Sequence, residues 1–289
     1  MPTIKTDKIE ISAKTKGAEL TSIKSKDGTE YLWQADPAFW PKHSPLLFPI
    51  IGSIPDKSYE FEGKTYPLEN HGFIWTKEFK LVEEKSDYIR FEITESEETL
   101  AIYPFRFTLS VGYRVKGDTL SVEYLVKNSD SKTIYFSIGA HPGFKVPADE
   151  SDKKEDYDIL FKKKETVKRY FLNKDNLLSG ESEMFLDKSD WVSVKKELFD
   201  KGAIVLKDHK SRSVSLKSRK SGRFVKLDFK GFPCLGIWSP KGDAPFICIE
   251  PWYGVMPLAG SSPDITKKEG IIALEKGKVF SSVYNITVG

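Results

Sequence analysis

Short runs of alternating apolar and polar residues dominate this chain. Alternation is clearest in five runs, at residues 88–94, 107–115, 120–126, 214–217 and 224–229. A period of two places one face of each run on a core and the other toward water or a ligand, which is typical of antiparallel strands. Two turn signals, Lys116-Gly117-Asp118-Thr119 and Ser221-Gly222, separate neighbouring runs and predict hairpins.

Helical patterns are few and short. The best candidates cover Ser193–Phe199 and Asp36–Trp40. Many strands at roughly even spacing predict an all-β sandwich or barrel rather than βαβ units. The charged stretch Asp149–Asp158 is interpreted as an exposed loop, not a linker, because similar strand patterns lie on both sides of it. We therefore predict a single domain over residues 1–289.

Composition and charge exclude several classes of protein. The chain has 289 residues, of which 39% are hydrophobic and 30% charged, as in ordinary soluble globular proteins. Lysine and arginine total 45 against 42 acids, and the basic residues are interspersed with acids or serine, which argues against a nucleic-acid binder. No apolar run approaches the 18 residues of a membrane span, and no signal peptide is visible. We expect a cytoplasmic protein.

The two cysteines, Cys234 and Cys248, each lie inside an apolar run. Free cysteine packs as a small hydrophobic residue, so both are predicted to be buried thiols. No Cys-x-x-Cys spacing indicates a metal site, and no disulfide framework is implied.

Two of the four histidines occupy similar surroundings. His71 and His141 both lie beside a glycine, with a phenylalanine close behind. Small neighbours permit close packing of the backbone and leave room for a ligand against the imidazole. Each histidine alone could be structural, but the matched pair favours function. His209 lies in a charged turn and is predicted to face solvent, whereas His43 could line a pocket or lie on the surface.

Glu250 ends the apolar run 246–249 and precedes Pro251-Trp252-Tyr253. Desolvation there would raise the pKa of its carboxyl toward the range of a general base. The alternative is a carboxylate that accepts backbone hydrogen bonds at the end of a strand. Five tryptophans lie near these segments and could stack on a sugar or pack in the core, namely Trp33, Trp40, Trp75, Trp238 and Trp252.

Several short motifs together resemble the aldose 1-epimerase (galactose mutarotase) family, and the LacX-like branch most closely. They occur in the family's order, from about Ile9 to Tyr284: Gly17-Ala18-Glu19-Leu20-Thr21-Ser22-Ile23, Glu30-Tyr31-Leu32-Trp33, Leu47-Phe48-Pro49-Ile50-Ile51-Gly52, Asn70-His71-Gly72-Phe73, Gly139-Ala140-His141-Pro142-Gly143-Phe144 and Phe246 to Trp252. The resemblance implies a large antiparallel β-sandwich of the galactose mutarotase type, with a sugar lying across one concave sheet.

The resemblance also implies roles for three residues. Glu250 would act as general base on the C1 hydroxyl, and His141 would protonate the ring oxygen so that the ring opens. His71 would hydrogen-bond near the ring oxygen or C1. Such interconversion of the anomers of an aldohexose requires no cofactor and no metal, because both steps are proton transfers. The partner is a small-molecule sugar, without nucleic acid or membrane.

The chain departs from the family where an arginine usually follows the Phe-Pro…Gly segment. Here Gly52 is followed by Ser53, and the nearest cation is Lys57, a point charge without the fork of arginine. Either the sugar contact is made differently, or the substrate differs, or activity is low. Ser53, Lys57, Trp238 and Phe73 are the expected lining of the substrate site, and Asp200 and Asp228 are candidates for the family's substrate-binding aspartate.

Three alternatives stay open at this stage. A hexose 6-phosphate 1-epimerase would need two or more cations around its pocket. A non-catalytic sugar-binding or sensing protein would keep its affinity when Glu250 is replaced by glutamine. A metal-dependent enzyme could use His71, His141 and Glu250 as ligands.

Overall fold

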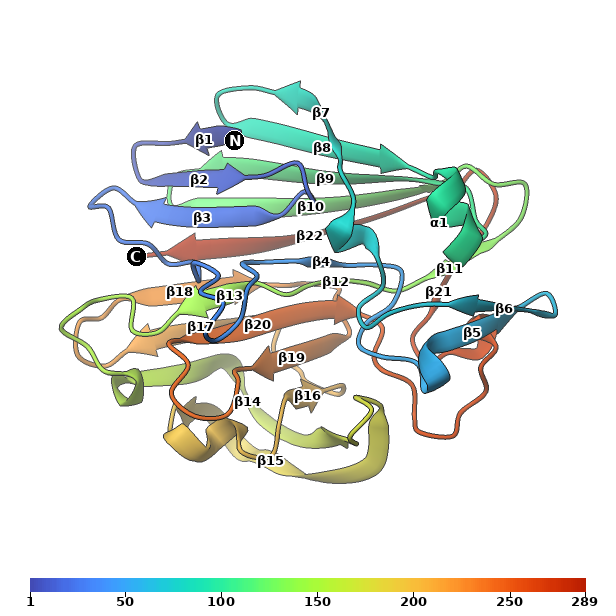
Figure 1. The fold of residues 1–289 in the computed structure, drawn as a ribbon. Coiled ribbons are helices and arrows are strands. Elements are labelled where there is room, and N and C mark those ends of the chain that lie inside the picture. The colour runs from blue at the N-terminus through green and yellow to red at the C-terminus, as the bar shows by residue number, and fades with distance from the viewer.

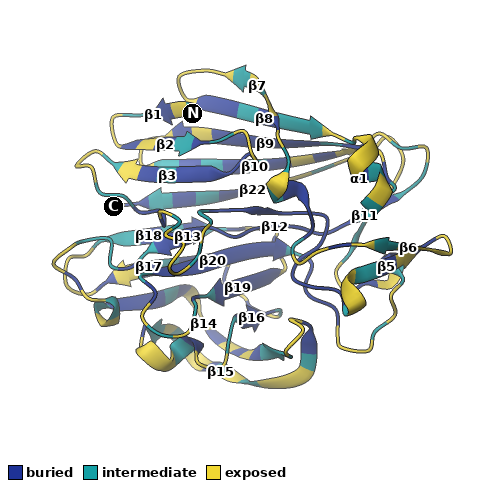
Figure 2. Ribbon diagram, viewed as in Figure 1, coloured by how far each residue is buried: buried dark blue, intermediate teal, exposed yellow.

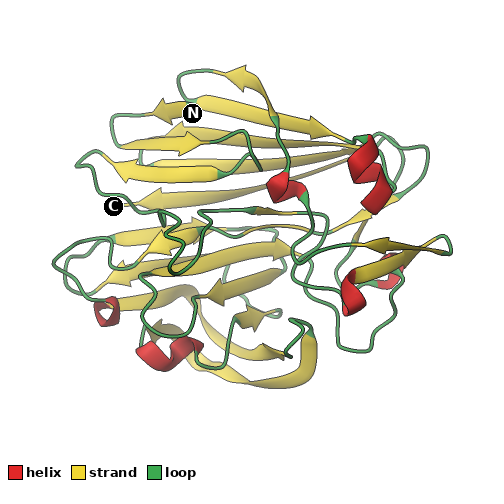
Figure 3. Ribbon diagram, viewed as in Figure 1, coloured by secondary structure: helices red, strands yellow, loops and turns green.

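The computed structural model describes all residues 1–289 and is built almost entirely from antiparallel strands (Figures 1 and 3). The largest sheet has 15 strands, and the path through 13 of them runs β4 (Leu46–Leu47), β12 (Ile138–Ala140), β20 (Phe246–Tyr253), β19 (Cys234–Trp238), β16 (Ile204–Leu206), β14 (Tyr157–Leu172), β17 (Ser213–Ser218), β18 (Phe224–Asp228), β22 (Val279–Val288), β10 (Thr119–Asn128), β9 (Phe107–Lys116), β8 (Tyr88–Thr94) and β7 (Lys80–Glu84). Off this path, β13 (Gly143–Lys145) pairs with β20, and β15 (Leu178–Ser193) pairs with β14.

Three smaller sheets complete the molecule. They are β1 (Thr3–Lys5), β2 (Ile9–Ala13) and β3 (Leu20–Ser25); β5 (Ser58–Phe61) with β6 (Lys64–Pro67); and β11 (Ile134–Phe136) with β21 (Ile272–Leu274). The structure confirms the predicted all-β antiparallel sandwich. It also confirms the hairpins that join β9 to β10 and β17 to β18, because both pairs are antiparallel neighbours.

Helices are short and lie at the periphery (Figure 3). They are α1 (Glu97–Ile102) and the 3-10 turns η1 (Pro55–Lys57), η2 (Ile74–Thr76), η3 (Lys154–Asp156), η4 (Lys196–Phe199) and η5 (Ile265–Lys267). The expected helix at Ser193–Phe199 is wrong in its first half, because Ser193 still belongs to β15. Asp36–Trp40 forms a turn in which the Asp36 carbonyl accepts from Trp40 N at 2.9 Å. At six residues, α1 is the longest helix, so no helix here can cross a bilayer.

A large apolar core fills the space between the strand layers. Its 62 buried residues extend from Ile4 to Val288, so both ends of the described chain contribute to it. Figure 2 shows the strand centres buried and the connecting turns exposed. Both cysteines are buried free thiols, as predicted. His209 was expected in solvent but is only 3% exposed, because it packs against Phe229 and contacts the Ser211 carbonyl through Nδ1 at 2.8 Å.

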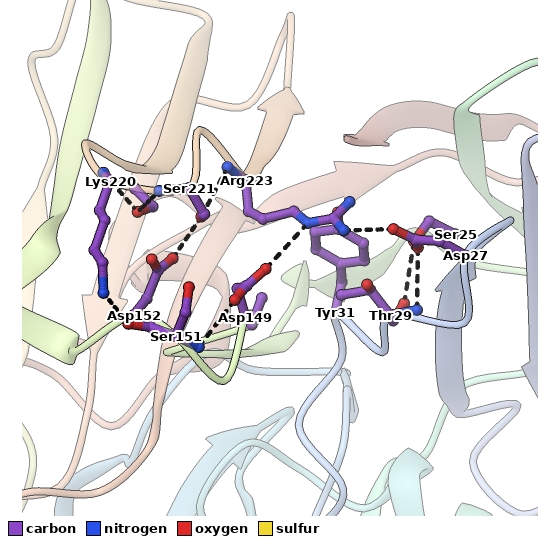
Figure 4. A network of polar contacts seen from close by, with 12 residues as sticks. Ser25, Asp27, Thr29, Tyr31, Asp149, Ser151, Asp152, Lys220, Ser221 and Arg223 are labelled. Carbon is purple, nitrogen blue, oxygen red and sulfur yellow. Dashed lines mark hydrogen bonds and ion pairs between the residues drawn. The ribbon is translucent and has the colours of Figure 1, made fainter.

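The charged stretch Asp149–Asp158 is a loop only through Lys153, after which η3 and the first two residues of β14 follow. A network of polar contacts packs this loop onto two other segments (Figure 4). Arg223, after the β17–β18 turn, pairs with Asp27 of the β3 turn and lies 3.8 Å from Asp149. Ser221 donates to Asp152 at 2.5 Å, and Asp152 is only 5% exposed. The predicted exposed loop is therefore partly buried, since its carboxylates are partners for hydroxyl and guanidinium groups.

Candidate active site

Glu250 lies in the middle of β20, a strand that is covered on both faces. Residues two apart on a strand share a face, so Glu250 and Trp252 point to the same side of the sheet. The neighbouring strands place Gly139 and Gly236 beside them, and a Cβ at either glycine would lie within 2.5 Å of the Trp252 ring. The absence of those side chains lets the indole lie flat across three strands and form a floor.

The Glu250 carboxyl is almost completely buried, at 2% exposure. Burial raises its pKa well above the ordinary value, because the charged form loses its hydration. No ammonium or guanidinium lies within 4.0 Å of it, and its titratable neighbours are the imidazole of His141 and the thiol of Cys248.

His141 follows β12 directly, and its Nε2 lies 3.3 Å from Oε2 of Glu250. The ring is stacked on Trp40, with centroids 4.8 Å apart, and meets the edge of Trp238 at 5.7 Å. Burial, and then the neighbouring His71, hold the pKa of His141 well below its ordinary value. The acid and the base expected from the sequence thus touch, and both are desolvated.

His71 is fixed by reciprocal hydrogen bonds with Gly52. The His71 amide donates to the Gly52 carbonyl at 2.7 Å, and the Gly52 amide donates to Nδ1 of His71 at 3.0 Å. Because Nδ1 accepts, the neutral ring carries its proton on Nε2. Burial lowers the pKa of His71 to about 3, so this ring is a neutral donor at physiological pH. Its centroid lies 5.5 Å from that of His141.

These side chains meet in a cavity of about 300 Å³. Four tryptophans form much of its wall, namely Trp40, Trp75, Trp238 and Trp252. The polar lining consists of Lys42, Asn70, His71, His141, Asn176 and Glu250. Flat apolar walls with a few convergent polar groups are typical of a site for a small polar ligand such as a sugar.

In the cavity, the structure brings together seven of the residues singled out in the sequence, namely His71, His141, Glu250, Trp40, Trp75, Trp238 and Trp252. It does not place Ser53, Lys57 or Phe73 in the cavity lining. The Ser53 side chain is buried beside its own backbone, and its hydroxyl is 3.4 Å from the Ile54 carbonyl. Lys57 is exposed and pairs with Glu69 at 3.1 Å.

Phe73 packs in the core against Phe48, with ring centroids 6.4 Å apart. The two candidate aspartates also lie outside the lining: Asp228 pairs with Lys226 at 2.8 Å, and Asp200 ends η4 at the surface.

Three polar lining residues were missed in the sequence, Lys42, Asn70 and Asn176. Asn70 could have been found because it directly precedes His71. Lys42 stands in a proline-bounded loop beside His43, and nothing in that pattern distinguishes a lining cation from a surface one. Asn176 lies in the β14–β15 turn, far along the chain from every motif.

One cluster could in principle hold a metal ion. Ligand atoms of His141, Cys248 and Glu250 lie within 4.8 Å of one another, and all three residues are buried. His71 is not a member of this cluster, contrary to the alternative that the sequence left open. Burial raises the pKa of the Cys248 thiol well above its ordinary value, which favours the protonated thiol in the metal-free site.

A buried carboxyl and imidazole in contact, facing a tryptophan-walled cavity on an antiparallel sandwich, are typical of an enzyme site for a small polar substrate. Comparison with known proteins specifies that class. The model of the aldose 1-epimerase family matches residues 2–264. The chromosomal protein LacX of Lactococcus lactis is 36% identical, over 99% of this chain and 98% of the relative.

Solved structures agree with the family match. A galactose mutarotase related enzyme from Lactobacillus acidophilus has a TM-score of 0.93 and 32% identity, over 99% of this chain and 96% of that one. A galactose mutarotase-like protein from Lactobacillus casei has a TM-score of 0.94 and 32% identity, over 100% of both chains. This chain belongs to the aldose 1-epimerase family; it has the galactose mutarotase-like fold and is an isomerase of that class.

Proposed function

We propose that the protein interconverts the α and β anomers of a free aldohexose without a cofactor, with Glu250 as the base and His141 as the acid. The observation that carries the proposal is the 3.3 Å contact between two buried groups whose pKa values are displaced in opposite directions. The C1 hydroxyl and the ring oxygen of an aldose are bonded to the same carbon. Two proton-exchanging groups in contact are therefore suitably spaced for this pair of oxygens.

The displaced pKa values define the resting state of the pair. Burial favours the neutral carboxylic acid of Glu250 and the neutral imidazole of His141, so in this mechanism the resting pair holds one exchangeable proton. Transfer of that proton from Glu250 to His141 gives a carboxylate and an imidazolium. No net charge has to enter the buried site, because both states of the pair have the same total charge.

Ring opening then follows with balanced protons. The Glu250 carboxylate takes the proton from the C1 hydroxyl, the bond from C1 to the ring oxygen breaks, and His141 gives its proton to that oxygen. The product is the open-chain aldehyde, with the pair again holding one proton. Rotation about C1–C2 and reversal of both transfers close the ring as the other anomer. His71 donates from Nε2 and stabilises the negative charge that develops on oxygen.

Polarimetry of freshly dissolved α-D-galactose and α-D-glucose tests this function. Wild type should accelerate the anomeric change, and His141→Asn and Glu250→Gln should each reduce kcat by about 10²–10⁴-fold. Isothermal calorimetry of Glu250→Gln with the same sugars provides the control. Retained sugar binding by an inactive variant of an active wild type supports catalysis, whereas a wild type that binds sugar without accelerating the change is a binding protein.

A further inference from the structure

The side chain of Lys42 is the only cation that lines the cavity, and it has no anionic partner. No carboxylate lies within 4.0 Å of its Nζ, and its ammonium donates no hydrogen bond. Its one close contact is the face of Trp75, with Nζ 3.5 Å from the ring centroid. Lys57, by contrast, already has Glu69 as a partner at 3.1 Å.

The backbone around Lys42 is held in place. The amides of His43 and Ser44 donate to Oε1 of Glu19 at 2.8 and 3.0 Å, and Glu19 is only 7% exposed. On the other side, Trp33 Nε1 donates to the Trp40 carbonyl at 2.8 Å. The loop therefore presents Lys42 to the cavity from a fixed base, and no hydrogen bond or ion pair holds the end of the side chain over Trp75.

We infer that Lys42 is a substrate-binding residue, whose ammonium leaves the Trp75 ring and donates to hydroxyl oxygens of a neutral aldohexose. The inference rests on the proposed function for the choice of ligand. An ammonium has three donors and no acceptor, and hydroxyl oxygens can accept from it. The ammonium would give up its contact with the aromatic face and gain charge-assisted hydrogen bonds, which are among the strong ones, in exchange.

The charges of the cavity favour a neutral sugar over a sugar phosphate. A phosphate group carries close to two negative charges and is bound by several donors, commonly two or more cations. Here Lys42 is the single cation, and both lining histidines are neutral because burial lowers the pKa of each. A single ammonium therefore suits a ligand with neutral hydroxyl groups better than it suits a ligand with a dianionic phosphate.

Calorimetric titration of galactose and glucose into wild type and three variants tests the inference. Lys42→Met keeps the apolar stem of the side chain. It should weaken binding of the preferred sugar by about 10–100-fold, because one or two charge-assisted hydrogen bonds are lost. Lys42→Arg should recover part of this loss, and Lys57→Met should bind like wild type. An unfolding temperature close to that of wild type would show that the variants fold, since Lys42→Met loses only the contact between the ammonium and the Trp75 ring.

Kinetics separate a binding role from a chemical one. In Lys42→Met, KM should rise by the same factor as the dissociation constant, while kcat changes less than threefold. Affinity equal to wild type in Lys42→Met, an equal loss in Lys57→Met, or no sugar binding to wild type would overturn the inference. Tighter binding of a hexose 6-phosphate than of the free hexose would contradict the neutral ligand. If wild type binds sugar through Lys42 but shows no mutarotation, the inference stands and the proposed function fails.

Discussion

Two reciprocal hydrogen bonds between Gly52 and His71 determine how one imidazole can take part in the reaction. The Gly52 amide occupies Nδ1, so His71 cannot accept a proton there without breaking the bond. With a pKa of about 3, the ring cannot act as a general acid at neutral pH either. His71 is therefore a donor of hydrogen bonds, whereas His141 and Glu250 exchange protons.

Replacement of His71 separates its hydrogen bond to the substrate from its structural hydrogen bond to Gly52. In His71→Asn, the amide oxygen can still accept from Gly52 but the donor toward the substrate is lost, so kcat/KM should fall about 10–100-fold with little loss of stability. His71→Ala should in addition lower the free energy of unfolding by about 1–3 kcal/mol, because the buried Gly52 amide loses its partner. Kinetics and urea unfolding of both variants measure the two effects; equal stability of the two would contradict the role of this bond.

The pH profile of kcat/KM reports the protons of the acid–base pair. Activity requires the form that holds one proton, and a second proton binds only when His141 becomes charged beside a neutral Glu250. Because burial holds the pKa of His141 well below 6.5, the acid limb should lie below pH 6.5. Initial rates from pH 4 to 9 test this. An acid limb at or above pH 6.5 would mean that the imidazole is solvated.

At the scale of elements, Glu19 links the loop before β3 to the loop that carries Lys42. One carboxylate oxygen accepts two backbone amides, and the other contacts Lys14 at 2.6 Å. Glu19→Ala should lower the free energy of unfolding by about 1–3 kcal/mol and also raise KM, since the loop would lose its anchor. Lys14→Ala is the matched control. It should change neither the free energy of unfolding nor KM by much, because half-exposed ion pairs contribute little. Chemical unfolding and kinetics give both quantities.

Alternation in the sequence predicted β8, β9, β10, β17 and β18, but it missed the longest strands, β14 and β15, which have 16 residues each. Alternation is visible in β8 and β10, where one face is partly solvated, and in the sequence of β9, although Leu109–Tyr113 of that strand are all buried. By contrast, β12 and β20 are covered on both faces and show no period of two. The helix α1 was missed, although Ser96 and Thr99 form a capping box at its start.

In the site, too, residues in local motifs were predicted, whereas a residue placed by long-range contacts was missed. Glu250 and His141 were predicted because each stands in a local motif, and their roles came from a resemblance to a family. The position of Lys42 depends on Glu19, more than twenty residues earlier in the chain, and on the ring of Trp75. Such long-range contacts leave no periodic signal in the sequence, so Lys57, which is nearer to Ser53, was chosen instead.

At the scale of the whole molecule, buried histidines make stability depend on pH. Nδ1 of His209 donates to the Ser211 carbonyl, and Nε2 is buried without a partner. Burial lowers its pKa, so its contribution is complete above the unfolded value near 6.5 and is lost as pH falls toward the folded value. For each pH unit in that window, the free energy of unfolding falls by up to about 1.4 kcal/mol per such histidine.

A His209→Gln variant should therefore show a shallower decline of unfolding free energy between pH 6.5 and 5 than wild type. Urea unfolding at several pH values measures the two slopes. His43→Gln, at a half-buried position, serves for comparison and should flatten the curve less. Parallel slopes for wild type and His209→Gln would show that His209 is hydrated in solution.

The place of β22 in the large sheet affects how the chain can be made in the cell. This strand follows all others in chain order, yet it lies between β18 and β10 and joins the two parts of the sheet. Its alternate residues Tyr284, Ile286 and Val288 are each at most 3% exposed. Until this segment has been synthesised, the strands before it have two unpaired edges, those of β18 and β10, and an open core, so the large sheet can close only once β22 is available.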